Sequence, residues 1–190
     1  MDVFPLLLLA GGASTRMGFP KGLIELDRGQ PLLIHQLEVF ENAGGQSACV
    51  VLGSHAASYE PLLERYLQRT KMQISTRINT EPHRGMFSSV QLGIDCLQQA
   101  PGLYLLPLDN PIKLSQTYRH LQNALDPKTE VCLAYSRGQK RHPLFIKQSL
   151  FNAVLAQSQT ARLDHFLRSI NSDKKQTIEI SDPWITFNLN

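Results

Sequence analysis

The residues best suited to chemistry lie in one glycine-rich stretch, 11–22, directly after the apolar run Val3–Ala10. Glycines let a backbone turn tightly and approach a ligand closely. Successive backbone N–H groups in such a loop form a concave site for anions. Ser14 adds a hydroxyl, and Arg16 and Lys21 add two permanent positive charges. The stretch therefore predicts a nucleoside triphosphate site, and the alternative is a strand-to-helix turn with solvated basic residues.

Two other groups of polar residues follow apolar runs. Asp109 follows Leu103–Leu108, and a carboxylate there can hold Mg²⁺ against phosphate oxygens. The alternative for Asp109 is a side-chain cap on the next helix. Lys140 and Arg141 stand directly before His142, either as a solvated basic loop or as a site for an anionic ligand.

The elements that must position these residues alternate between strand and helix patterns, which is typical of a three-layer α/β fold with a mostly parallel sheet. Ligands of such sheets bind beyond the carboxyl ends of the strands. Strands are expected at 3–10, 48–52, 72–78, 103–108, 130–135, 143–146, 177–180 and 184–189, and helices at 31–40, 59–67, 88–99, 115–125 (Ser115 as N-cap), 150–155 and 163–170. No linker divides the chain, so residues 1–190 are expected to form a single domain.

Composition excludes several classes of protein. Hydrophobic residues make up 42% and charged residues 18% of the 190 residues, which excludes a disordered chain. The net charge of +3 is too small and too little clustered for a dedicated nucleic-acid-binding protein. Three cysteines without a C-x-x-C pair argue against a disulfide scaffold and a zinc site and favour the cytoplasm. No leader or membrane span is expected, because Met1–Ala13 has no basic start and is too short.

The string LAGGASTRMGFPKGLIEL at 9–26 resembles the signature L-A-[AG]-G-x-S-x-R-[MF]-G-x-x-K of the MobA/MocA-like NTP-transferase family. It matches neither a P-loop nor a dinucleotide fingerprint. The resemblance implies a Rossmann-like nucleotidyltransferase fold. It also implies that Arg16 and Lys21 act in catalysis as well as in binding. The nucleotide-binding residues that it implies in this loop are Leu9, Ala10, Gly11, Gly12, Ser14, Arg16 and Lys21.

Further segments resemble the same family. The segment 106–111 (LPLDNP) is similar to its P-x-D-x-P motif, which implies that Asp109 binds the catalytic Mg²⁺. The segment 84–93 resembles G-M-x-x-S-x-x-x-G, which implies that Ser88 and Ser89 bind the nucleotide. The segments 142–145 and 161–167 resemble G-H-P-x-x-F and G-A-R-x-x-L. These last two imply an acceptor site that includes His142 and Arg141.

The family places a second metal ligand in a terminal N-x-N-T-P segment, whose start is matched by Phe187–Asn190. The resemblance therefore implies Asn190 as a metal ligand, or Asn188 if the register slips by two residues. A strand over Trp184–Leu189 is expected to bring one of these side chains beside Asp109. The Thr-Pro of the motif is not in this sequence, and Arg141 replaces the usual Gly. Both departures leave the acceptor open.

The resemblance implies an enzyme that moves an NMP from an NTP to a phosphorylated acceptor and releases pyrophosphate, as a monomer or small homo-oligomer in the cytoplasm. Its motifs are mixed between guanylyl and cytidylyl branches, so GTP and CTP are both candidates. Molybdopterin is the first choice of acceptor, and a sugar phosphate is the second. The alternative is a nucleotide-binding or regulatory protein that has lost turnover. No nucleic-acid or membrane partner is expected.

Overall fold

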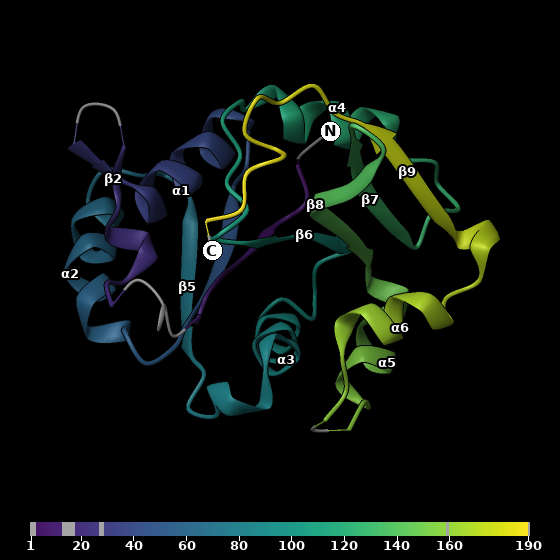
Figure 1. Ribbon diagram of the computed structural model, residues 1–190, viewed down its shortest axis with the longest axis horizontal. Coiled ribbons are helices and arrows are strands. Elements are labelled where there is room, and N and C mark those ends of the chain that lie inside the picture. Colours follow the sequence, from purple (N-terminus) through teal and green to yellow (C-terminus); the bar gives the residue numbers. More distant parts are fainter. Residues whose placement is uncertain (1–2, 13–17, 27–28, 159, 190) are drawn as a thin grey trace.

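The computed structural model describes residues 3–12, 18–26, 29–158 and 160–189. Within these ranges, seven strands form one sheet in the order β5-β4-β1-β6-β8-β7-β9, seen in Figure 1. The strands are β1 (Leu6–Ala10), β4 (Ser47–Leu52), β5 (Gln73–Ile78), β6 (Gly102–Pro107), β7 (Val131–Ser136), β8 (Gln139–Lys147) and β9 (Lys175–Glu179). A separate pair consists of β2 (Glu25–Leu26) and β3 (Gln30–Pro31). Strands β5, β4, β1 and β6 are parallel, whereas β8 is antiparallel to β6 and β7.

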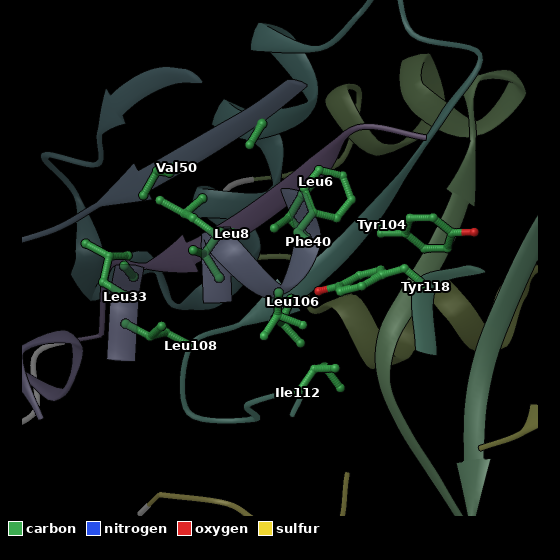
Figure 2. Close-up of a cluster of buried hydrophobic side chains, with 14 of the residues drawn as sticks. Leu6, Leu8, Leu33, Phe40, Val50, Tyr104, Leu106, Leu108, Ile112 and Tyr118 are labelled. Atoms are coloured by element: carbon green, nitrogen blue, oxygen red, sulfur yellow. The ribbon is translucent and has the colours of Figure 1, made fainter. Parts of the chain in front are cut away.

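Helices cover both faces of the sheet (Figure 1). The residues of β1 alternate between two cores: Leu6 and Leu8 pack in one core, and Leu7 and Leu9 in the other. The first core, shown in Figure 2, includes buried side chains of α1 (Leu32–Asn42), α2 (Ala56–Leu67) and α4 (Gln116–Ala124). The second core includes those of α3 (Met86–Cys96), α5 (Phe151–Leu155) and α6 (Leu163–Ser169). Short 3-10 turns are η1 (Lys21–Leu23), η3 (Pro82–Arg84), η4 (Gln148–Leu150) and η5 (Ser172–Lys174).

The central strands read as continuous apolar runs because both of their faces are covered. Every residue of β1 and of β6 is buried, as expected for parallel strands between helical layers. Helix α3 packs closely on β1, since a Cβ at Gly93 would lie 2.0 Å from Leu7 Cδ1. The predicted three-layer α/β fold with a mostly parallel sheet is therefore confirmed.

Ser115 stands at the predicted N-cap position of α4, but its side chain does not cap the helix. Ser115 has helical backbone angles and makes no capping hydrogen bond through its side chain. The buried carboxylate of Asp182 takes this place from far along the chain. It accepts hydrogen bonds from the backbone N–H of Lys113 (3.1 Å) and Leu114 (2.7 Å) and from the hydroxyl of Thr117 (2.9 Å).

The predicted strand over Trp184–Leu189 is wrong. The chain turns at 183–186 and has no regular structure at 187–189. Asp182 starts this turn, because its carboxylate also accepts from the backbone N–H of Trp184 at 2.8 Å. Such a side-chain bond two residues along the chain favours a turn over an extended strand. The segment still returns from β9 toward the end of β6 (yellow in Figure 1).

The predicted short strand at 143–146 is longer than expected. It is β8, which spans Gln139–Lys147 and pairs on both edges.

None of the helices in the described part of the chain is long and apolar enough to cross a lipid bilayer.

Candidate functional site

A cavity of about 390 Å³ opens where β1 and β6 end, and we call it the glycine-loop cavity. It brings together parts of the chain that are distant in sequence. Among them are Leu9–Gly12 after β1, Lys21 of η1, Ser89 of α3 and Pro107–Asp109 after β6. The predicted residues Leu9, Ala10, Gly11, Gly12, Lys21, Ser89 and Asp109 all line this cavity. Ser14 and Arg16, on which the sequence argument also depends, lie outside the described residues.

Glycines allow the loop after β1 to pack closely against its neighbours beside this cavity. A Cβ at Gly53 would lie 2.3 Å from the carbonyl oxygen of Gly11, so these two backbones touch. A Cβ at Gly11 would lie 3.3 Å from Ser89 Oγ. A larger residue at either glycine would therefore push apart the loop after β1 and its neighbours.

Opposite charges meet at one part of the cavity wall. Lys21 Nζ lies 4.0 Å from Asp109 Oδ2, and these side chains are 17% and 30% exposed. Asn110 Nδ2 donates to the other carboxylate oxygen at 2.8 Å. Both charges thus remain accessible to a ligand. A triphosphate can contact Lys21, while the oxygens of Asp109 suit a hard cation such as Mg²⁺.

The loop that carries Asp109 is held by three contacts that the sequence analysis did not predict. Buried Gln36 of α1 accepts from Ile112 N at 2.8 Å and donates to Ile112 O at 3.0 Å. Asp182 binds the next two backbone N–H groups, as described above, and Leu189 N donates to Asp109 O at 2.9 Å. One sequence feature could have pointed to Gln36, because it is a polar residue within the apolar face of a predicted helix. No comparable feature of the sequence points to Asp182.

Tyr59 of α2 also lines the cavity and was not predicted. Its hydroxyl oxygen accepts from Gly22 N at 3.2 Å, which ties η1 to the helical layer. A Cβ at Gly22 would lie 2.6 Å from the ring of Tyr59. Burial raises the pKa of Tyr59 above its ordinary value, and the bond from Gly22 opposes this rise. Tyr59 is therefore a neutral packing partner that fixes the turn next to Lys21.

A second cavity, of about 570 Å³, shares Gly85 and Met86 with the first, and we call it the basic cavity. Its basic lining residues are Arg84, Lys140, Arg141 and Arg162, its one acidic lining residue is Asp164, and His142 also lines it. Arg162 Nε donates to the Asp164 carboxylate at 3.0 Å. The predicted pair Arg141 and His142 thus lies in the same cavity wall.

Three buried nitrogen atoms in this wall have no hydrogen-bond partner among the described residues: Arg84 Nε, Arg141 Nε and His142 Nδ1. Buried polar groups without a partner are uncommon, and such groups often await a water or ion. Burial lowers the pKa of His142, against the opposing effects of the Leu105 carbonyl and the Asp109 carboxylate. The Nε–H groups of Arg84 and Arg141 lack acceptors among the described residues, so the wall is suited to an anionic ligand that supplies them. The imidazole of His142 is neutral, and one of its two nitrogen atoms accepts a hydrogen bond instead of donating one.

The C-terminal segment approaches Asp109 through its backbone. Leu189 N donates a hydrogen bond to Asp109 O, while Asn188 is exposed. Asn190 lies outside the described residues. Among the described residues, no group of three or more His, Cys, Asp and Glu side chains could hold a metal. A metal at Asp109 would thus need further oxygens, which substrate phosphates supply in many magnesium sites.

Two curated proteins have sequences that are similar to parts of this chain. The bifunctional protein GlmU of Paracidovorax citrulli is 31% identical over 123 residues, which is 64% of this chain and 25% of that protein. The 2-C-methyl-D-erythritol 4-phosphate cytidylyltransferase of Leptospira interrogans is 45% identical over 67 residues, 33% of this chain and 27% of that protein. The matches thus span only about a quarter of the length of these relatives.

A solved structure with a similar fold is Rv0371c of Mycobacterium tuberculosis, with a TM-score of 0.74 at 19% identity over 95% of this chain and 89% of that chain. A manganese complex of Rv0371c has a TM-score of 0.70 at 18% identity, over 94% and 89% of the two chains. The model of the MobA-like NTP transferase domain matches residues 6–176, which include the ends of β1 and β6 and both cavities but not the C-terminal segment. The chain therefore belongs to the MobA-like NTP transferase domain family.

Proposed function

We propose that this protein transfers an NMP from GTP or CTP to a small phosphorylated acceptor, with Mg²⁺, and releases pyrophosphate. In this reaction an acceptor phosphate oxygen forms a bond to the α-phosphorus, and the bond from that phosphorus to the pyrophosphate oxygen breaks. The observation that carries the proposal is that two neighbouring cavities share the lining residues Gly85 and Met86. One cavity has the family's glycine loop with Lys21 and Asp109, and the other has a cationic wall.

The residues of the glycine-loop cavity bind and orient the nucleotide in this proposal. Backbone N–H groups near Gly11 and Gly12 face the phosphates, as in other glycine-rich anion sites. Lys21 neutralises charge on the phosphates, and Ser14 and Arg16 act with it. The acceptor phosphate is already anionic, so the protein mainly positions it in line and offsets charge. No protein nucleophile is required.

Asp109 is the residue proposed to hold Mg²⁺, and its oxygens suit that ion. When bound, the ion would supply charge neutralisation to the phosphates. Asn188 or Asn190 is the proposed second protein ligand. The manganese complex of the similar Rv0371c structure supports a divalent metal in this fold.

The basic cavity is the proposed acceptor site, with Arg141 and His142 as acceptor-binding residues. The Nε–H groups of Arg84 and Arg141, which lack acceptors among the described residues, favour a phosphorylated molecule over a neutral one. Molybdopterin is the first acceptor to test because of the family resemblance. A small polyol or sugar phosphate is the second, because the Leptospira relative is described as acting on 2-C-methyl-D-erythritol 4-phosphate.

A pyrophosphate-release assay tests the proposal. Each of the four NTPs is combined with molybdopterin, 2-C-methyl-D-erythritol 4-phosphate or a hexose 1-phosphate, with and without Mg²⁺. We expect release with GTP or CTP and one acceptor only, and loss of it in Asp109→Asn. Exposed Lys71, in a different part of the surface, gives the control Lys71→Ala. Tight NTP binding without release for any acceptor would favour a nucleotide-binding protein instead.

A further inference from the structure

Helix α1 is bonded to both segments that carry the charged pair of the glycine-loop cavity, Lys21 and Asp109. At the start of the helix, Leu32 N donates to Ile24 O at 2.8 Å, and Ile24 N donates to Lys21 O at 3.0 Å. The N-terminal end of α1 is therefore fixed to η1, the turn that begins with Lys21.

The next turn of α1 is bonded to the loop that carries Asp109. Gln36 is fully buried, and it bonds to both the N–H and the C=O of Ile112, three residues after Asp109. Ile112 is also fully buried and belongs to no helix or strand. Buried backbone groups need hydrogen-bond partners, and Gln36 supplies one for each of these two groups.

The packing of α1 does not require a glutamine at this position. The surrounding face of the helix is apolar and fully buried, with Leu32, Leu33, Leu37 and Phe40. A buried hydrogen bond adds only modestly to stability, because it replaces hydrogen bonds to water. Gln36 adds a directional link between α1 and the loop of Asp109, which an apolar side chain could not provide.

We infer that Gln36 is a positioning residue that fixes the Asp109 carboxylate relative to Lys21, and thereby sets how tightly the site binds a divalent metal together with a triphosphate. This inference rests on the proposed nucleotide site. A metal–triphosphate ligand has to contact both side chains at once, and their charged atoms lie 4.0 Å apart. Substitution of a group that orients a metal ligand commonly lowers metal affinity by about 10- to 100-fold.

Gln36→Met tests the inference, because methionine is unbranched and a good helix former but makes neither hydrogen bond. Calorimetry of the full chain with inorganic triphosphate, with and without Mg²⁺, gives the ratio of the two affinities. We expect the wild type to bind triphosphate more tightly with Mg²⁺, and this ratio to fall by about tenfold in Gln36→Met. Asp109→Asn shows the ratio that remains without the carboxylate.

Gln122→Met is the matched control. Gln122 of α4 is partly buried and accepts from Phe4 N at 3.1 Å and from the Tyr104 hydroxyl at 3.3 Å. It lines neither of the two cavities. Both methionine variants should lower the melting temperature, but only Gln36→Met should lower the ratio.

Gln36→Glu is a second variant, for the case that Gln36→Met folds poorly. A neutral carboxyl group has an acceptor oxygen and an O–H donor, which are the two functions that the amide serves here. Burial favours the neutral form of a carboxyl group. Relative to the wild type at the same pH, we expect the ratio to be nearly restored at about pH 6 and reduced at about pH 8. The nearby His35, Lys113 and Asp182 are present in both proteins.

The ratio separates positioning from a merely structural role. If it is the same in the wild type and in the Gln36 variants, Gln36 only supports the fold and the inference is wrong. An equal fall in Gln122→Met would assign the change to lost stability and would also overturn the inference. A fall confined to the Gln36 variants supports it even without pyrophosphate release, which would count against the transfer reaction alone. If Mg²⁺ does not tighten binding to the wild type, both the inference and the proposed metal site are wrong.

Discussion

The glycine-loop cavity and the basic cavity share a wall but are held in different ways. Around the first cavity, protein contacts already satisfy the polar groups: Gln36 and Asp182 hold the loop of Asp109, and Asn79 holds Ser89. In the second, the nitrogen atoms Arg84 Nε, Arg141 Nε and His142 Nδ1 have no partner.

This difference bears on how each cavity recognises its ligand. Groups that are held by buried hydrogen bonds are preorganised, so a ligand does not have to order them. An arginine Nε–H group that lacks an acceptor gains more from an anion, because the anion supplies the missing hydrogen bond. We expect the first cavity to distinguish between ligands by the geometry of their contacts. We expect the second cavity to bind ligands mainly according to their charge.

The largest effect is expected from Lys21→Ala, which removes the proposed phosphate-binding charge from the preorganised cavity. A charge-assisted hydrogen bond contributes about 1.5–3 kcal/mol, so pyrophosphate release should fall by roughly 10- to 150-fold. The melting temperature should change little, because Lys21 Nζ and Asp109 Oδ2 are 4.0 Å apart and both side chains are partly exposed, and such ion pairs contribute little to stability. Steady-state kinetics against both substrates checks this. Unchanged turnover would mean that this cavity is not the phosphate site.

Asp182→Asn tests whether buried contacts hold the first cavity together. The carboxylate accepts from two backbone N–H groups before α4, from Thr117 and from Trp184. An amide keeps the shape but places a donor against donors, so we expect the free energy of unfolding to fall by about 2 kcal/mol. Urea denaturation measures this, with exposed Asp173→Asn as the control. A loss no greater than that of the control would show that the loop does not depend on Asp182.

Arg141→Ala tests the cationic wall. We expect the acceptor KM to rise by about tenfold, with NTP affinity unchanged, because one charge-assisted contact is lost. Stability should be unchanged or slightly higher, since the variant removes a buried nitrogen atom without a partner. An equal loss of NTP affinity would contradict the separation of the two cavities.

The smallest effect concerns pH. Burial lowers the pKa of His142, and also that of His35, below the ordinary value in the folded state. The unfolded chain then binds more protons, so stability should fall as the pH drops through about 6.5 toward the folded pKa. His142→Gln should show a smaller loss between pH 7.5 and pH 5.5, measured by thermal unfolding. An identical loss in the variant would assign the pH dependence to other groups.

The sequence by itself determined the layers of the fold and the main wall of the first cavity. Apolar runs such as Leu6–Ala10 specify buried parallel strands, because only a sheet that is covered on both faces buries every side chain. Polar residues after such strands must then meet at one edge of the sheet. The sequence analysis assigned Lys21 to the phosphates and Asp109 to the metal, and the structure has their side chains 4.0 Å apart.

Only the tertiary structure decided which polar side chains hold that edge in place. Asp182 caps the start of α4, which local sequence assigned to Ser115, because the chain returns from β9 and brings a carboxylate to free N–H groups. The same contact turns the chain at Trp184, where the sequence indicated a strand. Asn79 and the serines of α3 meet for a similar reason. Hydrogen bonds between distant segments depend on how the layers pack, and a local pattern of residues does not specify that packing.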